Sequence, residues 1–437
     1  MSAQESSLHS PSGLHSPSGL HSRASLPGPS GDEADLPVII VGSGPAGLRV
    51  ARELQHRMPN LCLRLFGDEP HEPYSREQLS SWLAGQLPQE DLLRPLQGLR
   101  LESVEQRFGC RIVGLDPLAR TVTDSSGASW CYRTLVIATG TRPHIPAIPG
   151  MQLAGVFRFH DLDDATRLLA RRARSHHTII LGAGLLGLEV AQGMRQMGTR
   201  VTVLDHADRL LPMQLDEHAS AFLQYEMCRR DIAVLPGCGV SRVLGEERVE
   251  GVRLRDGTEL ACDTLVLATG VRPDIDFARA ARLAHRRGIL VNDRMQTSDP
   301  AIYAVGDCAE HRERCYGHLA PGLEQAVVAA ANICGETREY RGSIPASRLK
   351  VLGTPMFSIG PMGIDARRHY GLSYRFCDPG NDRYRCILVH RHRLVGAIGV
   401  GEWDEAERIE AHVRKRGWIK PWQIWRFQRS GRLGISG

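Results

Sequence analysis

The chain has 437 residues, more than a single hydrophobic core usually serves, so several domains are expected. Hydrophobic residues make up 42% and charged residues 24% of the sequence, as in ordinary globular proteins. The formal net charge of +5 is too small for this length to indicate nucleic-acid binding. No apolar run approaches the roughly 18 residues of a transmembrane segment, and the amino terminus lacks an apolar secretion signal. We therefore expect a cytoplasmic protein.

The first 36 residues differ in amino-acid composition from the rest of the chain. The hexad LHSPSG begins at Leu8, repeats at Leu14 and starts again at Leu20. Ser, Pro, Gly and His dominate, and such residues bury too little apolar surface to offset the cost of ordering a backbone. The pattern predicts a disordered, low-complexity leader over residues 1–36.

Cysteine usage bears on both metal binding and redox chemistry. The sequence has 11 cysteines, an odd number, and no two of them form a C-x-x-C pair. This argues against a disulfide framework and against a zinc or iron–sulfur site, so no metal site is expected. Cys308 and Cys315 are expected to pack rather than to react.

A glycine-rich motif follows the short β-branched run VIIV over residues 38–41. Gly42, Gly44 and Gly47 form G-x-G-x-x-G and open a helix-compatible stretch. The first glycine permits a tight turn, the second lets the backbone approach a pyrophosphate, and the third lets helix and strand pack closely. The helix amino terminus then presents free N–H groups to the phosphates. The motif predicts a dinucleotide site.

The acid that completes this first site has two candidates. The next predicted strand, LCLRLF, ends near Asp68 and Glu69, and one of these carboxylates should bind a ribose hydroxyl. Gly67 occupies the position where such an acid often stands, so both candidates stay open.

A second motif of the same kind follows the run TIIL over residues 178–181. Gly182, Gly184 and Gly187 repeat the pattern, and the next predicted strand, RVTVL, ends at Asp205. A carboxylate there accepts hydrogen bonds from a ribose 2′-hydroxyl and repels a 2′-phosphate. A charged hydrogen bond contributes roughly 1.5–3 kcal/mol, which favours NADH over NADPH about ten- to a hundredfold.

The two motifs belong to an internal repeat. YRTLVIATGTRP over residues 132–143 matches CDTLVLATGVRP over residues 262–273 almost letter for letter. The repeat predicts an α/β protein with two tandem Rossmann-like dinucleotide-binding units.

A third signal separates the two cofactors. The stretch TSDPAIYAVGDCAE contains a predicted strand that ends at Asp307, where an acid can hydrogen-bond the ribityl chain of a flavin. An isolated Gly-Asp pair is weak, but two nucleotide motifs beside it favour FAD in the first unit. We expect an FAD-binding domain in two parts, 37–150 and 276–342, around an NAD-binding domain over 151–275.

Jointly, these motifs resemble the pyridine nucleotide–disulfide oxidoreductase superfamily. Within it, the chain resembles rubredoxin and ferredoxin reductases, and most of all the flavin module of the NADH-dependent assimilatory nitrite reductase large subunit. The stretches that carry the likeness are EPYSREQLSS (72–81), GLLGLEVA (184–191), GILVNDRMQTSDPAIYAVGDCAE (288–310), HLAPG (318–322) and SRLKVLG (347–353).

The resemblance implies a set of cofactor-binding residues and one catalytic residue. Glu189 matches a family acid near the nicotinamide. The implied FAD residues are Gly42, Gly44, Pro45, Ala46, Gly47, Asp68 or Glu69, Arg76, Leu79, Thr139, Gly140, Asp307 and Pro321. The implied NADH residues are Gly182, Gly184, Leu185, Gly187, Asp205 and Gly270.

The chain differs from the disulfide reductases of the family in the segment that would carry the redox-active cysteines. Disulfide reductases carry paired cysteines in the helix after the first unit, whereas this chain has only Ser75, Ser80 and Ser81 there. A disulfide relay is therefore not expected. Ser81 also replaces a lysine of many relatives, so a lysine pair with Glu189 is not expected.

These features predict an FAD-dependent NADH oxidoreductase that passes electrons to a protein carrier, such as a small acidic ferredoxin or rubredoxin or a nitrite-reductase-type centre. One alternative is an NADH oxidase or quinone reductase that acts on small acceptors. Another is a flavoprotein with an interaction role, like apoptosis-inducing factor. The sequence leaves a homodimer open.

Residues 343–437 predict a smaller α+β domain. RCILVHRHRLVGAIGVG over 385–401 indicates a hairpin, and DEAERIEAHVRKR over 404–416 indicates a helix. The tail from Arg414 has seven Lys or Arg, no acid, and the tryptophans Trp418, Trp422 and Trp425. Either this tail contacts an acidic carrier or an anionic membrane, or its aromatic side chains fold back onto the body.

Overall fold

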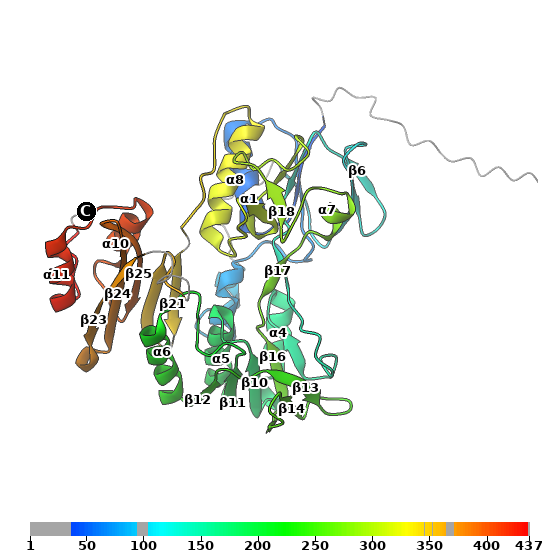
Figure 1. Cartoon of the computed structure of the whole chain (residues 1–437). Coiled ribbons are helices and arrows are strands. Elements are labelled where there is room, and N and C mark those ends of the chain that lie inside the picture. The colour runs from blue at the N-terminus through cyan, green and yellow to red at the C-terminus, as the bar shows by residue number, and fades with distance from the viewer. Residues whose placement is uncertain (1–35, 94–103, 345, 352, 364–370, 436–437) are drawn as a thin grey trace, which may run out of the picture.

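A computed structural model describes residues 36–93, 104–344, 346–351, 353–363 and 371–435 of the chain (Figure 1). Apart from residue 36, the predicted leader lies outside the described residues. Within them, no helix is long and apolar enough to cross a bilayer.

The first of three five-stranded sheets is parallel and contains the predicted strand at residue 38. The order of its strands is β19 (Ile302–Ala304), β7 (Thr134–Ile137), β1 (Val38–Val41), β2 (Leu63–Phe66) and β3 (Val104–Arg107). Helices α1 (Pro45–Arg57) and α8 (Leu319–Ile333) pack on one face, and the antiparallel strands β4 (Ile112–Asp116), β5 (Thr121–Asp124) and β6 (Ser129–Cys131) cover the other. The runs of Val, Ile and Leu are continuous because both faces are buried. We call this body the first unit.

The second sheet repeats this plan. Its strand order is β12 (Ile232–Leu235), β11 (Arg200–Leu204), β10 (His177–Leu181), β16 (Thr264–Leu267) and β9 (Val156–Arg158). Around it lie α4 (Leu162–Ala170), α5 (Leu185–Gln196), α6 (Glu217–Arg229) and the antiparallel strands β13 (Val240–Leu244), β14 (Gly251–Leu254) and β15 (Glu259–Ala261). We call this body the second unit.

The internal repeat is therefore confirmed as a repeat of topology. The order β7-β1-β2-β3 in the first unit corresponds to β16-β10-β11-β12 in the second. The two units meet where β8 (Thr141–Pro143) pairs antiparallel with β17 (Val271–Pro273), so that Arg142 lies opposite its repeat counterpart Arg272. These strands directly follow the two matched Ala-Thr-Gly sequences. Corresponding parts of the repeat therefore pair with each other as strands.

Short elements complete the first and second units. They are η2 (Arg76–Gln78), α2 (Leu79–Leu83), α3 (Gln89–Leu92), η3 (Arg172–Arg174), α7 (Asp276–Ala280), β18 (Ile289–Val291), η4 (Gly306–Cys308) and β20 (Ala309–His311).

The C-terminal unit is a five-stranded antiparallel sheet with helices on its outer side, which confirms an α+β arrangement (Figure 1). Its strand order is β21 (Ala346–Val351), β22 (Thr354–Ile359), β25 (Arg393–Val400), β24 (Arg383–His390) and β23 (Leu372–Asp378). The remaining elements are η5 (Pro379–Asn381), α10 (Ala406–Arg414) and α11 (Pro421–Ser430). The predicted hairpin and helix are both present.

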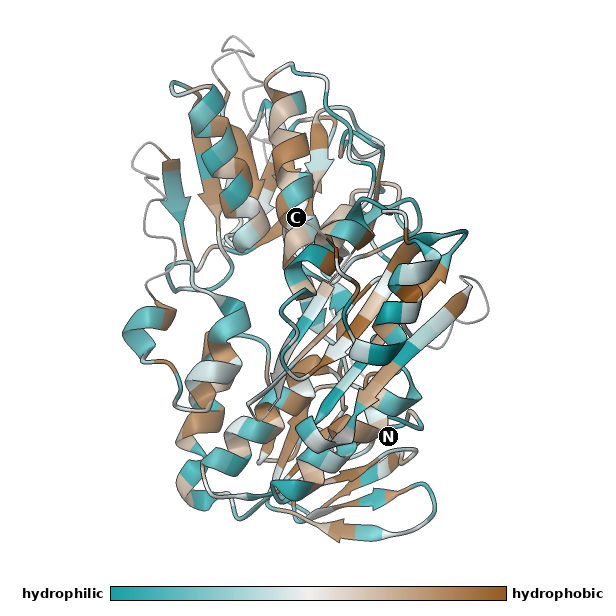
Figure 2. Cartoon of the chain, turned by 90° about the vertical axis from the view of Figure 1, so that its left-hand side faces the viewer, coloured by the Kyte–Doolittle hydropathy of each residue, from teal (hydrophilic) through white to brown (hydrophobic). Residues whose placement is uncertain are grey.

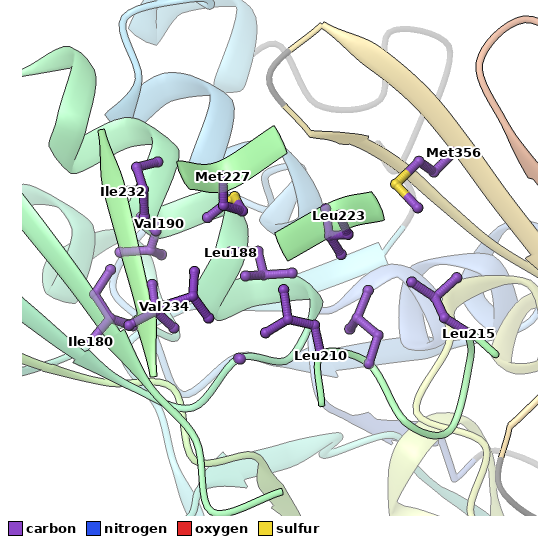
Figure 3. Close-up of a cluster of buried hydrophobic side chains, with 14 of the residues drawn as sticks. Ile180, Leu188, Val190, Leu210, Leu215, Leu223, Met227, Ile232, Val234 and Met356 are labelled. Atoms are coloured by element: carbon purple, nitrogen blue, oxygen red, sulfur yellow. The ribbon is translucent and has the colours of Figure 1, made fainter. Parts of the chain in front are cut away.

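One apolar cluster joins the C-terminal unit to the second unit. Met356 of β22 belongs to the same buried apolar cluster as Leu223 and Met227 of α6 and the core side chains of β10 and β12 (Figure 3). Burial of apolar surface stabilises this contact at roughly 25 cal/mol per Å². The C-terminal sheet is thereby held against the second unit.

The tryptophans of the tail remain at the surface. The exposed fractions of Trp418, Trp422 and Trp425 are 61%, 53% and 58%. Ile419 and Phe427 are buried instead and attach the tail to the sheet. The expectation that the tail's aromatic side chains fold back is therefore wrong for these tryptophans. Figure 2 views the molecule from the side of α10 and α11, where helices of mixed hydropathy cover the more hydrophobic strands.

Candidate functional site

The first glycine motif forms a turn that only glycine can occupy. Gly42 has φ +117°, and a Cβ there would lie 2.1 Å from the carbonyl oxygen of Ala138. A Cβ at Gly47 would lie 2.0 Å from the carbonyl oxygen of Gly42. A Cβ at Gly44 would instead meet no protein atom within 4 Å. The chain thus keeps open space at the very glycine where a pyrophosphate has to approach the backbone.

The second motif reproduces this geometry. Gly182 has φ +114°, and a Cβ there would lie 2.3 Å from the carbonyl oxygen of Ala268. Gly187 would clash with Gly182 in the same way, and Gly184 again faces open space. No side chain caps the amino termini of α1 and α5, so their first N–H groups are available to phosphate. Both sites fit a dinucleotide.

The residues after the second glycine start the two helices. Pro45 and Leu185 are the first residues of α1 and α5. The Ala46 side chain lies against the turn of η4, since a Cβ at Gly306 would be 3.1 Å from its methyl group. The first glycine motif therefore contacts the segment that carries Asp307.

Asp205 lies at the end of β11, as predicted, and is held by the backbone. Its Oδ2 accepts a hydrogen bond from the N–H of Ala183 at 2.5 Å, and its Oδ1 accepts one from the N–H of Ala207 at 2.8 Å. The side chain is 12% exposed. A carboxylate has about four acceptor positions, so these two bonds orient it and leave acceptors for a ribose.

The equivalent place in the first unit is built differently. Gly67 stands where Asp205 stands in the repeat, and a Cβ there would be 2.6 Å from the Ser43 hydroxyl oxygen. Asp68 is 58% exposed and pairs with Arg111 at 2.8 Å. Burial raises its pKa, although nearby Arg142 opposes the shift. The carboxylate of Glu69 is already engaged by Tyr74 and Arg76.

The segment 72–81 crosses from the first unit to the second. The Tyr74 hydroxyl donates to Glu69 at 2.6 Å and accepts a hydrogen bond from the N–H of Leu162 at 2.9 Å. Arg76 pairs with Glu69 and donates to the carbonyl oxygen of His160 at 3.2 Å. Sequence reasoning missed Tyr74, because a single tyrosine between a proline and a serine carries no distinctive signal.

Two helices meet at the start of the second glycine motif. Leu79 and Ser80 are buried residues of α2, and the Ser80 hydroxyl donates to Oε2 of Glu189 on α5 at 2.7 Å. Burial raises the pKa of the Glu189 carboxyl, and the Ser80 hydrogen bond lowers it in part. Glu189 therefore lies at the contact between α2 and α5, whose apolar side chains belong to one buried cluster.

The matched ATG sequences hold the two units together. The Thr139 hydroxyl donates to the carbonyl oxygen of Asp274 at 2.6 Å, and that of its counterpart Thr269 donates to His144 at 2.5 Å. The glycines that follow, Gly140 and Gly270, have φ +69° and +89°, and a Cβ at either would meet open space. The backbone of each turn, rather than the threonine hydroxyl, is free to face a cofactor.

The side-chain amide of Gln325, which contacts the turn before Asp307, has a nitrogen without a partner among the described residues. The Gly306 N–H donates to Oε1 of Gln325 on α8 at 2.8 Å. Gln325 is 1% exposed, and within the described part of the chain its Nε2 has no partner. Burial raises the pKa of Asp307, and His318 opposes the shift. Pro321 is buried in the first turn of α8. A buried free donor costs energy unless a bound group accepts from it.

The cysteines differ in burial: three are buried (Cys262, Cys308 and Cys386) and four are exposed (Cys62, Cys131, Cys228 and Cys377). All 11 are free, and Cys308 is fully buried, with its sulfur 3.3 Å from the carbonyl oxygen of Val305. Burial raises the pKa of the Cys308 thiol to about 11, so it is protonated at neutral pH. Among the residues with a described position, no three potential metal ligands form a cluster.

Comparisons with known proteins agree with this geometry. The pyridine nucleotide-disulphide oxidoreductase family matches residues 36–332, and the rubredoxin NAD+ reductase C-terminal domain matches residues 345–417. The nitrite reductase [NAD(P)H] of Bacillus subtilis is 34% identical over 381 residues, which are 86% of this chain and 47% of that protein. The chain thus spans about half the length of such relatives.

Two further relatives are similar in length to this chain. The ferredoxin–NAD(+) reductase component of the biphenyl dioxygenase system of Paraburkholderia xenovorans is 33% identical, over 74% of this chain and 80% of that protein. The fold also matches putidaredoxin reductase in its covalent complex with putidaredoxin, with a TM-score of 0.82 and 25% identity over 92% of this chain and 100% of that one. The chain therefore belongs to the pyridine nucleotide-disulphide oxidoreductase family, whose cofactors, FAD and NAD(P)H, it shares.

Proposed function

We propose that this chain accepts a hydride from NADH on FAD and passes the electrons to a protein carrier such as a ferredoxin or a rubredoxin. The observation that carries the proposal is the pair of open glycine motifs, Gly44 in the first unit and Gly184 in the second, each at an uncapped helix terminus. Similarity to ferredoxin and rubredoxin reductases supports a protein acceptor.

FAD fits the first unit. Its pyrophosphate would lie at Gly44 and the start of α1, and the free Nε2 of Gln325 would find an acceptor. Asp307 and Gly140 lie at the turns that face the same space. Bound flavin supplies hydride acceptance and one- or two-electron release. The chain supplies alignment and exclusion of water.

NADH fits the second unit better than NADPH. Two backbone N–H groups hold the Asp205 carboxylate in place, so it cannot turn away from a ribose 2′-substituent without breaking both bonds. A 2′-hydroxyl can donate to it, whereas a 2′-phosphate would be repelled. This argument supports NADH as the donor.

Glu189 is the residue that we propose lies at the nicotinamide. The Ser80 hydroxyl holds its carboxylate, and both side chains connect α2 with α5. Hydride transfer itself requires no acid or base, so Glu189 would act by orienting the dinucleotide. Serines in place of cysteines in the segment 72–81 support direct transfer to the carrier without a disulfide relay.

An anaerobic absorption titration tests the donor half of the proposal. Flavin bands of the purified protein should bleach with about one equivalent of NADH, and faster with NADH than with NADPH. Flavin that NADH leaves oxidised would contradict the proposal and would favour an interaction role.

The acceptor half is tested by comparing carriers. The reduced protein should be reoxidised faster by an acidic ferredoxin or rubredoxin than by oxygen or a soluble quinone, and added salt should slow only the protein carriers. Rapid turnover with oxygen or quinone alone would favour the oxidase alternative.

A further inference from the structure

A cavity rich in arginine lies where the first unit meets the C-terminal unit. Its volume is about 640 Å³, within the range of small-molecule sites. Its lining includes the basic residues Arg314, His390, Arg391, Arg393 and Arg416. No Asp or Glu is among the described residues that line it. The cavity is thus positively charged, and it is separate from both glycine motifs.

Most of these guanidinium groups have no partner. Within the described residues, the side chains of Arg314, Arg391 and Arg416 form no ion pair or hydrogen bond. Neighbouring charges are paired, since Arg312 contacts Asp293 at 2.7 Å and Glu313 contacts Arg286 at 2.8 Å. Like charges that gather without counterions repel one another, so this arrangement favours a bound anion.

The fourth arginine is fixed in place. Arg393 donates to the carbonyl oxygen of Arg416 at 2.8 Å, and its guanidinium carbon lies 5.0 Å from the ring centre of Trp418. These contacts hold the guanidinium at the cavity edge without neutralising its charge. A preorganised donor of this kind loses less entropy when it binds an anion.

The backbone around the cavity has unusual residues for its conformation. Arg391 and His392 form the two-residue loop of the β24–β25 hairpin, with φ +47° and +62°. Arg416, just after α10, has φ +48°. Glycine and asparagine are preferred at such positions, because the Cβ of other residues crowds the backbone there. Arg391 and Arg416 thus reach one cavity from two separate turns that share the same backbone conformation.

We propose that this cavity binds a small, multiply phosphorylated anion. Planar guanidinium groups bind phosphate oxygens in pairs, and several of them converge here. Ile344, Val395 and Val413 also line the cavity, so an apolar part of such a ligand would find contacts. Because Arg314 comes from the first unit and Arg391 from the C-terminal unit, the ligand would link the two.

The positive φ values of Arg391 and Arg416 allow these arginines to be removed without loss of stability, which gives a test of anion binding. In the variant R391G/R416G, both guanidinium groups are removed and glycine takes backbone positions that it prefers. The protein should therefore melt no lower than the parent. A matched control is R282G, because Arg282 also has a positive φ, +61°, but does not line the cavity.

Binding is measured by calorimetry with inorganic pyrophosphate, on FAD-loaded protein saturated with NAD+ so that both dinucleotide sites are filled. The parent and R282G should bind with equal affinity, R391G/R416G at least tenfold more weakly, and salt should weaken binding. Equal binding by all three proteins, or no binding by the parent, would overturn the proposal. A decaglutamate peptide that binds while pyrophosphate does not would overturn it in favour of an acidic protein partner.

Discussion

The Ser80 hydroxyl donates to the Glu189 carboxylate at 2.7 Å, and this bond connects α2 with α5. Ser80 is buried, and burial also raises the pKa of Glu189. The bond therefore stabilises the ionised carboxylate in a place that otherwise disfavours it. Many relatives are expected to have a lysine one residue further along, at the position of Ser81.

Substitution of Ser80 should weaken this contact. In S80A, the ionised Glu189 loses its partner, and a hydrogen bond to a charged group contributes roughly 1.5–3 kcal/mol. We expect a loss of stability of about that size at pH 8, measured by urea unfolding. The double variant S80A/E189Q should recover most of it. A double variant as unstable as S80A would contradict the assignment of the effect to the carboxylate.

The raised pKa of Glu189 also predicts how stability depends on pH. A carboxyl with a raised folded-state pKa contributes stability below its unfolded pKa, near 4, and loses it as pH rises through the folded pKa. E189Q removes this titration. The variant should therefore gain stability over the parent as pH rises from 4 to 8, and thermal melts at several pH values measure the difference. A constant difference across this range would contradict the prediction.

The sequence predicts the parts of the fold that depend on local pattern. The runs VIIV and TIIL, each followed by glycines, predict β1 and β10 and the helices after them. The acid at the end of β11 is found as expected. These features follow from residue spacing within one element, which is visible in a single sequence.

Contacts between distant residues are not visible in that way. The Thr139 hydroxyl binds Asp274 and Gln325 binds Gly306, but nothing in the residues around them marks these pairs. In α11, Ile424 and Phe427 repeat at helical spacing, and so do Trp422 and Trp425. Because both faces have an apolar pair, the sequence alone cannot show which one is buried.

Substitutions of Gly44 and Gly184 should affect the two proposed cofactor sites separately. In G44A, the new methyl group meets no protein atom, so the chain should fold but hold FAD at least tenfold more weakly. In G184A, the FAD content should be normal and the KM for NADH should rise at least tenfold. Flavin absorbance per chain and steady-state kinetics measure the two effects. Equal FAD loss in both variants would contradict the placement of the cofactors.

Asp205 should set the choice of nicotinamide dinucleotide. D205S removes the charge and keeps an acceptor for one backbone N–H, so the second unit should still fold. We expect the ratio of kcat/KM for NADH to that for NADPH to fall about ten- to a hundredfold. D256S, at the turn between β14 and β15, removes the same charge elsewhere and should leave the ratio unchanged. A ratio that moves equally in both variants would indicate an effect of net charge.

The exposed tryptophans of the tail offer a test of carrier docking. Truncation of the tail is unsuitable, because Phe427 and Leu433 are part of the hydrophobic core. W422Q/W425Q changes only side chains that are more than half exposed, so the fold should persist. Exposed aromatic residues beside arginine are typical of protein interfaces, and Arg429 lies 4.1 Å from the ring centre of Trp425.

If the carrier docks on this face, NADH-driven reduction of the carrier should slow at least fivefold in W422Q/W425Q. Reduction of ferricyanide should not change, because a small acceptor needs no docking surface. Tyr225, which is 59% exposed on α6, provides the control Y225Q for the loss of a surface aromatic side chain. Equal rates of carrier reduction in the parent and W422Q/W425Q would place the docking site elsewhere, and equal losses with both acceptors would indicate a damaged fold.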